Sequence, residues 1–185
     1  SLGWRAVPTK ESVLGPLARK TAPAIKQWIV EALVEKEDLE RELFRLRRRI
    51  GERSRQAWGD LSDGLYMASL SNKTVVYKAM VRSEVLASFY QDLRADSFEV
   101  AFAVYHRRFS TNTLPRWPLA QPMRLLGHNG EINTLLGNLN WAKATEVNLD
   151  EVWGTNADDL KPVVNQAFSD SANLDATLEL LVRSG

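Results

Sequence analysis

The most constraining feature of this sequence is an apolar run at residues 100–105 that stops abruptly at basic residues. The run is rich in β-branched and aromatic side chains, the composition of a buried β-strand. It ends at His106, Arg107 and Arg108, and Pro115 and Pro118 prevent a regular strand or helix from continuing. The sequence therefore predicts a core strand that runs into a polar loop.

This loop has the chemistry of a carboxylate-binding site. Residues 110–113 supply four short polar side chains, Ser-Thr-Asn-Thr, shortly after Arg108. A guanidinium is planar and can pair with a carboxylate through two hydrogen bonds. A salt bridge at the strand end is the other interpretation, and on these residues alone it is slightly favoured.

A second polar segment follows at Asn129-Gly130, a dipeptide typical of tight turns because both residues tolerate positive φ. Apolar residues at positions 132, 135, 136, 139 and 142 then fall on one face of a helix. A turn that opens a helix leaves backbone N–H groups free near the positive end of the helix dipole. The Asn129 amide and the Gly130 N–H could therefore stabilise a developing oxyanion.

The clearest helix is predicted over residues 39–55, where leucines and an isoleucine recur at helical spacing and Asp38 could cap the start. Its other faces carry seven arginines, at positions 41, 45, 47, 48, 49, 53 and 55. A nucleic-acid recognition helix is one interpretation. A solvated face balanced by neighbouring glutamates is much more probable, since no aromatic platform accompanies the arginines.

The remaining patterns predict support structure. A short strand is expected near residues 5–7, and a short or kinked helix over residues 11–20. Residues 25–34 could form a strand or a helix, and a strand is preferred. Residues 65–77 should form a β-hairpin, Phe89 and Tyr90 should be buried, and residues 150–161 should be a loop. Asp170 should begin a last helix, with Leu174, Leu178, Leu181 and Val182 on one face, and could serve as its N-cap.

The two polar segments together resemble the class II glutamine amidotransferase domain of glutamate synthase large chains. The resemblance rests on residues 106–118 (HRRFSTNTLPRWP) and 125–141 (LLGHNGEINTLLGNLNW), and on 2–8, 168–175 and 178–185. It implies an α+β fold that is part of a four-layer α-β-β-α sandwich of the N-terminal nucleophile type. Residues 1–185 would be an internal part of one such domain, without the upstream nucleophile segment or the downstream remainder.

The resemblance also implies roles for individual residues. Arg108, helped by Thr111 and Asn112, would bind the α-carboxylate of glutamine, and Asp170 would bind its α-ammonium group. Asn129 and Gly130 would form the oxyanion hole. His106 and His128 flank these segments, and both are expected to be structural, orienting the loops through hydrogen bonds.

One departure from the family pattern matters most. The family's nucleophile is an N-terminal Cys whose own α-amine acts as base, whereas this sequence contains no Cys and starts with Ser1. Ser1 is not expected to replace it. The fragment alone should therefore be inactive, and a non-catalytic glutamine-binding or interaction module with the same fold is the alternative.

Cofactors and partners follow from the same resemblance. FMN and an iron–sulfur cluster are implied for a synthase part outside this sequence, and no cofactor for these 185 residues. Expected partners are glutamine, the rest of the chain, and ferredoxin or a nicotinamide-dependent small subunit. A net charge of +1 gives no case for nucleic acid, and no apolar run approaches the roughly 20 residues that span a bilayer. A cytoplasmic location, or a plastid in a photosynthetic eukaryote, is expected.

Overall fold

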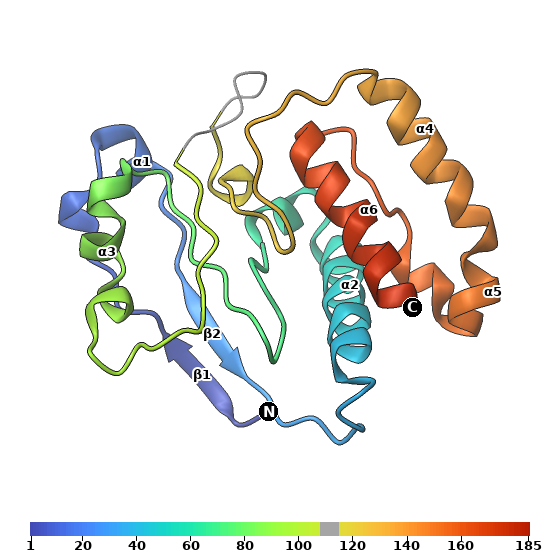
Figure 1. Ribbon diagram of the computed structural model, residues 1–185, viewed down its shortest axis with the longest axis horizontal. Coiled ribbons are helices and arrows are strands. Elements are labelled where there is room, and N and C mark those ends of the chain that lie inside the picture. The colour runs from blue at the N-terminus through green and yellow to red at the C-terminus, as the bar shows by residue number, and fades with distance from the viewer. Residues whose placement is uncertain (108–114) are drawn as a thin grey trace.

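The computed structural model of the chain describes residues 1–107 and 115–185 and combines helices with one small sheet (Figure 1). A mixed α and β composition was predicted, and it is confirmed. The strands are β1 (Gly3–Ala6) and β2 (Lys26–Ile29). The helices are α1 (Pro16–Lys20), α2 (Leu39–Trp58), α3 (Leu86–Phe89), α4 (Leu135–Thr145), α5 (Leu149–Trp153) and α6 (Asp170–Ser184), with short 3-10 turns between them. No helix among the described residues is long and apolar enough to cross a membrane.

The two strands pair antiparallel, with Trp4 opposite Trp28. Their rings stack with centroids 5.7 Å apart. A strand was predicted near residues 5–7, and for residues 25–34 a strand was preferred over a helix. Arg5 of β1 reaches across to Asp92, and that contact holds the pKa of the Asp92 carboxyl below its usual range. The hairpin is thereby tied to the segment that follows α3.

Two apolar cores lie on either side of the middle of the molecule. The first, on the left of Figure 1, joins α1, α3 and Val7, which directly follows β1, and it includes the predicted buried pair Phe89 and Tyr90. The second joins α2, α4, α5 and α6. Its members are Phe44, Leu139, Ala142, Leu149, Trp153, Ala157, Leu160, Val163, Val164 and Leu180. Residues 150–161 were expected to be a loop, but they lie mostly in α5 and in a 3-10 helix (Gly154–Leu160) whose Ala157 and Leu160 enter this core.

Helix α2 is the amphipathic helix that was predicted, although Asp38 makes no capping hydrogen bond with its side chain. Two of its arginines, Arg45 and Arg55, pair with glutamates one turn earlier, Glu42 and Glu52. These pairs are the balanced surface that the sequence favoured.

Other arginines of α2 bind the protein itself rather than facing solvent. Arg41 lies 4.0 Å from the centre of the Trp153 ring. Arg48 donates to the carbonyls of Leu160 and Pro162, and burial lowers its pKa to about 10. Arg41 and Arg48 thus hold α2 to the rest of the protein, which does not favour the interpretation of α2 as a nucleic-acid recognition helix.

Two predicted β elements are wrong. Residues 100–105 form no strand, and Phe102 keeps 77% of its surface exposed. A strand needs a neighbour to satisfy its alternating N–H and C=O groups, and none of the described residues pairs with this run. Residues 65–77 reverse direction without a ladder, because serine hydroxyls accept the backbone N–H groups: Ser69 binds Val76 and Ser71 binds Thr74.

Helix α6 is also turned the opposite way from the prediction. Its buried side chains are Asp170, Ser171, Asn173, Asp175, Glu179 and Leu180, whereas Leu181 of the expected apolar face is 63% exposed. The physical reason is that the buried acids have partners on other elements. Glu179 pairs with Arg47 of α2 inside the protein, and Arg183 pairs with Glu40 at 2.6 Å.

Candidate functional site

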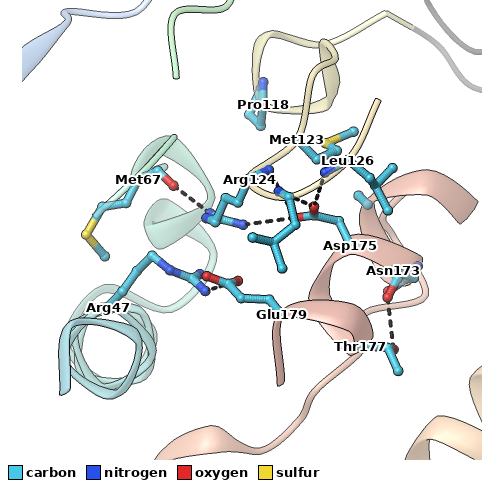
Figure 2. A network of polar contacts seen from close by, with 12 residues as sticks. Arg47, Met67, Pro118, Met123, Arg124, Leu126, Asn173, Asp175, Thr177 and Glu179 are labelled. Carbon is cyan, nitrogen blue, oxygen red and sulfur yellow. Dashed lines mark hydrogen bonds and ion pairs between the residues drawn. The ribbon is translucent and has the colours of Figure 1, made fainter. Parts of the chain in front are cut away.

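Residues 118–129 form the stretch of chain that leads to the predicted site, and we call this stretch the approach segment. Its backbone is held by one carboxylate of α6, as Figure 2 shows. Asp175 accepts hydrogen bonds from the backbone N–H groups of Arg124 (3.2 Å), Leu125 (2.8 Å) and Leu126 (3.2 Å). Asp175 is only 1% exposed, so these bonds do not compete with water.

The opposite side of the approach segment rests on a buried amine. Lys78 donates to the Pro118 carbonyl at 3.0 Å and to the Tyr66 hydroxyl at 3.2 Å. Burial lowers the pKa of Lys78. For Tyr66, burial raises the pKa, but the positive charges of Arg124 and Lys78 outweigh it and the net pKa is lowered. The segment is therefore fixed on both sides before it reaches His128.

Asp170 lies in the first turn of α6, but it is not the N-cap. Ser169 caps the helix, and its hydroxyl accepts the Ala172 N–H. Asp170 is buried and accepts two hydrogen bonds at Oδ1, from the Ser171 N–H (2.6 Å) and the Ser171 hydroxyl (3.1 Å). The cap that the sequence left open for Asp170 thus belongs to its neighbour, and Ser171 orients the Asp170 carboxylate.

The two histidines join the loops to this helix, as the sequence predicted. Nε2 of His128 lies 2.8 Å from the Ser171 hydroxyl. Nε2 of His106 lies 2.9 Å from the His128 carbonyl and 2.8 Å from Oδ1 of Asn129. Hydrogen bonds therefore link Asn129 to His106 and His106 to the His128 backbone, and the His128 side chain continues the link through Ser171 to Asp170. Asn129 and Asp170 are 41 positions apart in the printed sequence.

The Asn129-Gly130 segment is not the predicted tight turn. Neither residue has positive φ; the left-handed residue nearby is Thr134, at φ 58°, immediately before α4 begins at Leu135. The helix start is therefore five residues beyond Gly130, so the helix dipole does not act at this N–H. Among the described residues, no backbone carbonyl accepts a hydrogen bond from the Gly130 N–H.

An open hollow of about 540 Å³ adjoins these residues and is lined by Tyr105, His106, Arg107 and Asn129. It therefore borders the proposed oxyanion donor. The predicted carboxylate-binding residues Arg108, Thr111 and Asn112 lie outside the described residues.

A comparison with known protein families decides the class of this chain. The family model described as "Glutamine amidotransferases class-II" matches residues 1–185. The chain belongs to the class-II glutamine amidotransferases. The resemblance seen in the sequence is thus confirmed over the whole length of the amidotransferase chain.

Among relatives, the amidotransferase is 52% identical over 188 residues to the chloroplastic ferredoxin-dependent glutamate synthase of Oryza sativa subsp. japonica. It is 52% identical over 188 residues to ferredoxin-dependent glutamate synthase 2 of Synechocystis. It is 46% identical over 186 residues to the glutamate synthase [NADPH] large chain of Azospirillum brasilense. These alignments cover 99–100% of the amidotransferase chain but only 12% of each relative.

Two residues of this candidate site were not singled out from the sequence. Ser171 and Asp175 both fall in residues 168–175, which supported the resemblance, but neither was given a role. The signal available in the sequence was an acidic residue at position 175 inside a predicted helix. It was given no role because the leucine pattern placed the buried face of that helix elsewhere. No group of three or more His, Cys, Asp or Glu in the described part of the amidotransferase could hold a metal ion.

Proposed function

We propose that this chain supplies the glutamine-binding and oxyanion-stabilising part of the glutaminase site of a glutamate synthase. The complete protein would hydrolyse glutamine to glutamate and ammonia, and the ammonia would be transferred to 2-oxoglutarate to make glutamate. The contacts that connect Asn129 with Asp170, from Asn129 to His106, from His106 to the His128 backbone, and from the His128 side chain through Ser171, carry the proposal. Membership of the class-II family and the names of the relatives support it.

In this proposal the ends of glutamine are held by opposite charges. Arg108, with Thr111 and Asn112, binds the α-carboxylate, because a guanidinium matches a carboxylate in charge and geometry. Asp170 binds the α-ammonium group while Ser171 keeps its carboxylate oriented. Together they place the side-chain amide of glutamine next to Asn129.

The reacting carbonyl oxygen would then lie against the Asn129 amide and the Gly130 N–H, which stabilise the negative charge that develops during attack. The attacking thiol must come from residues outside this sequence, since the sequence contains no Cys. The binding-module alternative differs at this one point, because it predicts glutamine binding without ammonia release in the complete protein.

The surroundings of the site belong to the same proposal. This chain would be an internal part of one class II domain, within a four-layer α-β-β-α sandwich. FMN and an iron–sulfur cluster would be bound by the synthase part of the protein, because these 185 residues contain no Cys to ligate a cluster. Electrons would come from ferredoxin or a nicotinamide-dependent small subunit. The location would be cytoplasmic, or plastid in a photosynthetic eukaryote.

The role of Asp170 can be tested with a glutamine analogue. In the complete protein, Asp170→Asn should raise KM for glutamine about 10–100-fold, since a hydrogen bond to a charged group contributes about 1.5–3 kcal/mol. The variant should also lose the preference for glutamine over glutaramate, which lacks the α-amino group. Asp150→Asn is the matched control, because Asp150 is exposed. Undiminished preference in Asp170→Asn would remove Asp170 from the binding site.

The role of Arg108, which comes from the family resemblance, can be tested by mutation. Arg108→Ala in the complete protein should raise KM for glutamine about 100-fold, because it removes a two-bond ion pair with the α-carboxylate. The same variant should no longer distinguish glutamine from its α-amide in steady-state glutaminase assays. Arg116→Ala, which changes an exposed arginine nearby, should leave both quantities unchanged. Equal kinetics for the two variants would contradict the assignment.

A further inference from the structure

The hydrogen bonds of His106 determine which of its ring nitrogens carries a proton. Its Nε2 atom lies 2.9 Å from the backbone carbonyl oxygen of His128. A carbonyl oxygen can only accept a hydrogen bond, so Nε2 must carry the hydrogen. The same N–H also faces an atom of the Asn129 side-chain amide at 2.8 Å.

This donor sets the orientation of the Asn129 amide. An asparagine amide has an accepting oxygen at one end and a donating NH₂ at the other, and the two ends are similar in shape. Next to an N–H donor, the oxygen must face the imidazole. The NH₂ group of Asn129 then points away from His106, and it is the NH₂ group that an oxyanion needs.

We propose that His106 is a positioning residue that holds the Asn129 amide in the one orientation that can stabilise an oxyanion. The inference rests on the proposed function, since it assumes that Asn129 is an oxyanion donor. His106 takes no proton from the substrate in this scheme. If the amide turned over, its carbonyl oxygen would face the developing negative charge and the hole would repel the charge instead of binding it.

His128 provides an internal contrast, because its Nε2 bonds Ser171 and not Asn129. Ser171 donates to Asp170, so His128 acts on the end of the site that would bind the ammonium group. A change at His128 should therefore appear mainly in KM for glutamine, whereas a change at His106 should appear mainly in kcat.

The test compares two substitutions of equal length in the complete protein, His106→Gln and His106→Glu. Glutamine can donate an N–H to Asn129, whereas an ionised glutamate can only accept and should draw the NH₂ group toward itself. His106→Gln should keep kcat for glutamine hydrolysis within about threefold of wild type. Since losing an oxyanion donor costs about 10²–10³-fold in kcat, His106→Glu should lower kcat at least about tenfold, with KM little changed.

Both substitutions are then repeated with Asn129→Ala present. If His106 acts through Asn129, the Gln and Glu variants should have equal kcat in that background. A difference that persists would mean that the glutamate charge or a disturbed loop is responsible, and this would overturn the inference. Equal activity of the two variants with Asn129 intact would overturn it as well.

The outcomes separate this inference from the proposed function. If Asn129→Ala alone leaves kcat unchanged, then Asn129 is not an oxyanion donor and the proposed function fails at that residue. If Asn129→Ala is slow but the two His106 variants differ equally in both backgrounds, only the positioning role fails. His128→Gln and His128→Ala serve as comparison variants, and their expected effect is a raised KM.

Discussion

Asn129→Ala should lower kcat for glutamine hydrolysis by the complete protein about 10²–10³-fold, the usual loss for one side-chain donor of an oxyanion hole. KM should change little, because the oxyanion forms only after glutamine has bound. The structure supplies the geometric basis: Oδ1 of Asn129 is engaged by His106, and the side chain borders the open hollow. Steady-state ammonia release at several glutamine concentrations gives both constants.

The matched control is Asn140→Ala, since Asn140 is an exposed amide on α4 and its loss should leave kcat within twofold. An equal loss in the two variants would point to general damage of the domain. A raised KM with normal kcat in Asn129→Ala would assign the residue to substrate binding instead of to the reaction step.

Asp175→Ala should be the most destabilising single change in this part of the chain. It removes a buried acceptor of three backbone N–H groups and leaves Arg124, whose guanidinium lies 4.0 Å from Asp175, without that carboxylate. Removing one partner of a buried charged pair typically costs about 3–5 kcal/mol. The approach segment should then loosen locally, and the site that it leads to should loosen with it.

Amide hydrogen exchange of the complete protein measures this effect directly. Peptides that contain residues 124–126 should exchange about 10²–10³-fold faster in Asp175→Ala, since each 1.4 kcal/mol is a factor of ten and part of the cost falls elsewhere. Asp158→Ala is the control, because the Asp158 side chain is 92% exposed. Unchanged protection of residues 124–126 in Asp175→Ala would show that the three N–H bonds do not hold the segment.

Hydrophobic spacing and composition predicted the elements that depend on contacts between residues close in sequence. The helix α2 follows from its apolar spacing. The pairing of β1 with β2 was not predicted, and its nearest partners, Ala6 and Lys26, are 20 positions apart. The positions of Asn129 and Asp170 came from the family resemblance, and the structure links them through the two predicted structural histidines.

The errors share one physical cause, which is that the deciding contacts are remote in sequence. Glu179 is buried because Arg47, 132 positions away, pairs with it, and no hydrophobic period can reveal such a partner. Residues 100–105 have strand composition but no described neighbour strand, and composition does not encode whether a neighbour exists. The Asn129 conformation likewise depends on His106, 23 positions earlier.

The buried polar face of α6 fixes the distance between two carboxylates, Asp170 and Asp175. Asp170 and Asp175 are five residues apart on one rigid element, a rise of about 7.5 Å at 1.5 Å per residue. The Asp170 carboxylate accepts hydrogen bonds from Ser171, and the Asp175 carboxylate binds the backbone that leads to Asn129. The relative placement of the two carboxylates therefore depends more on the length of the helix than on its composition. A leucine on the exposed face can be replaced, but one inserted residue would turn Asp175 by about 100° relative to Asp170.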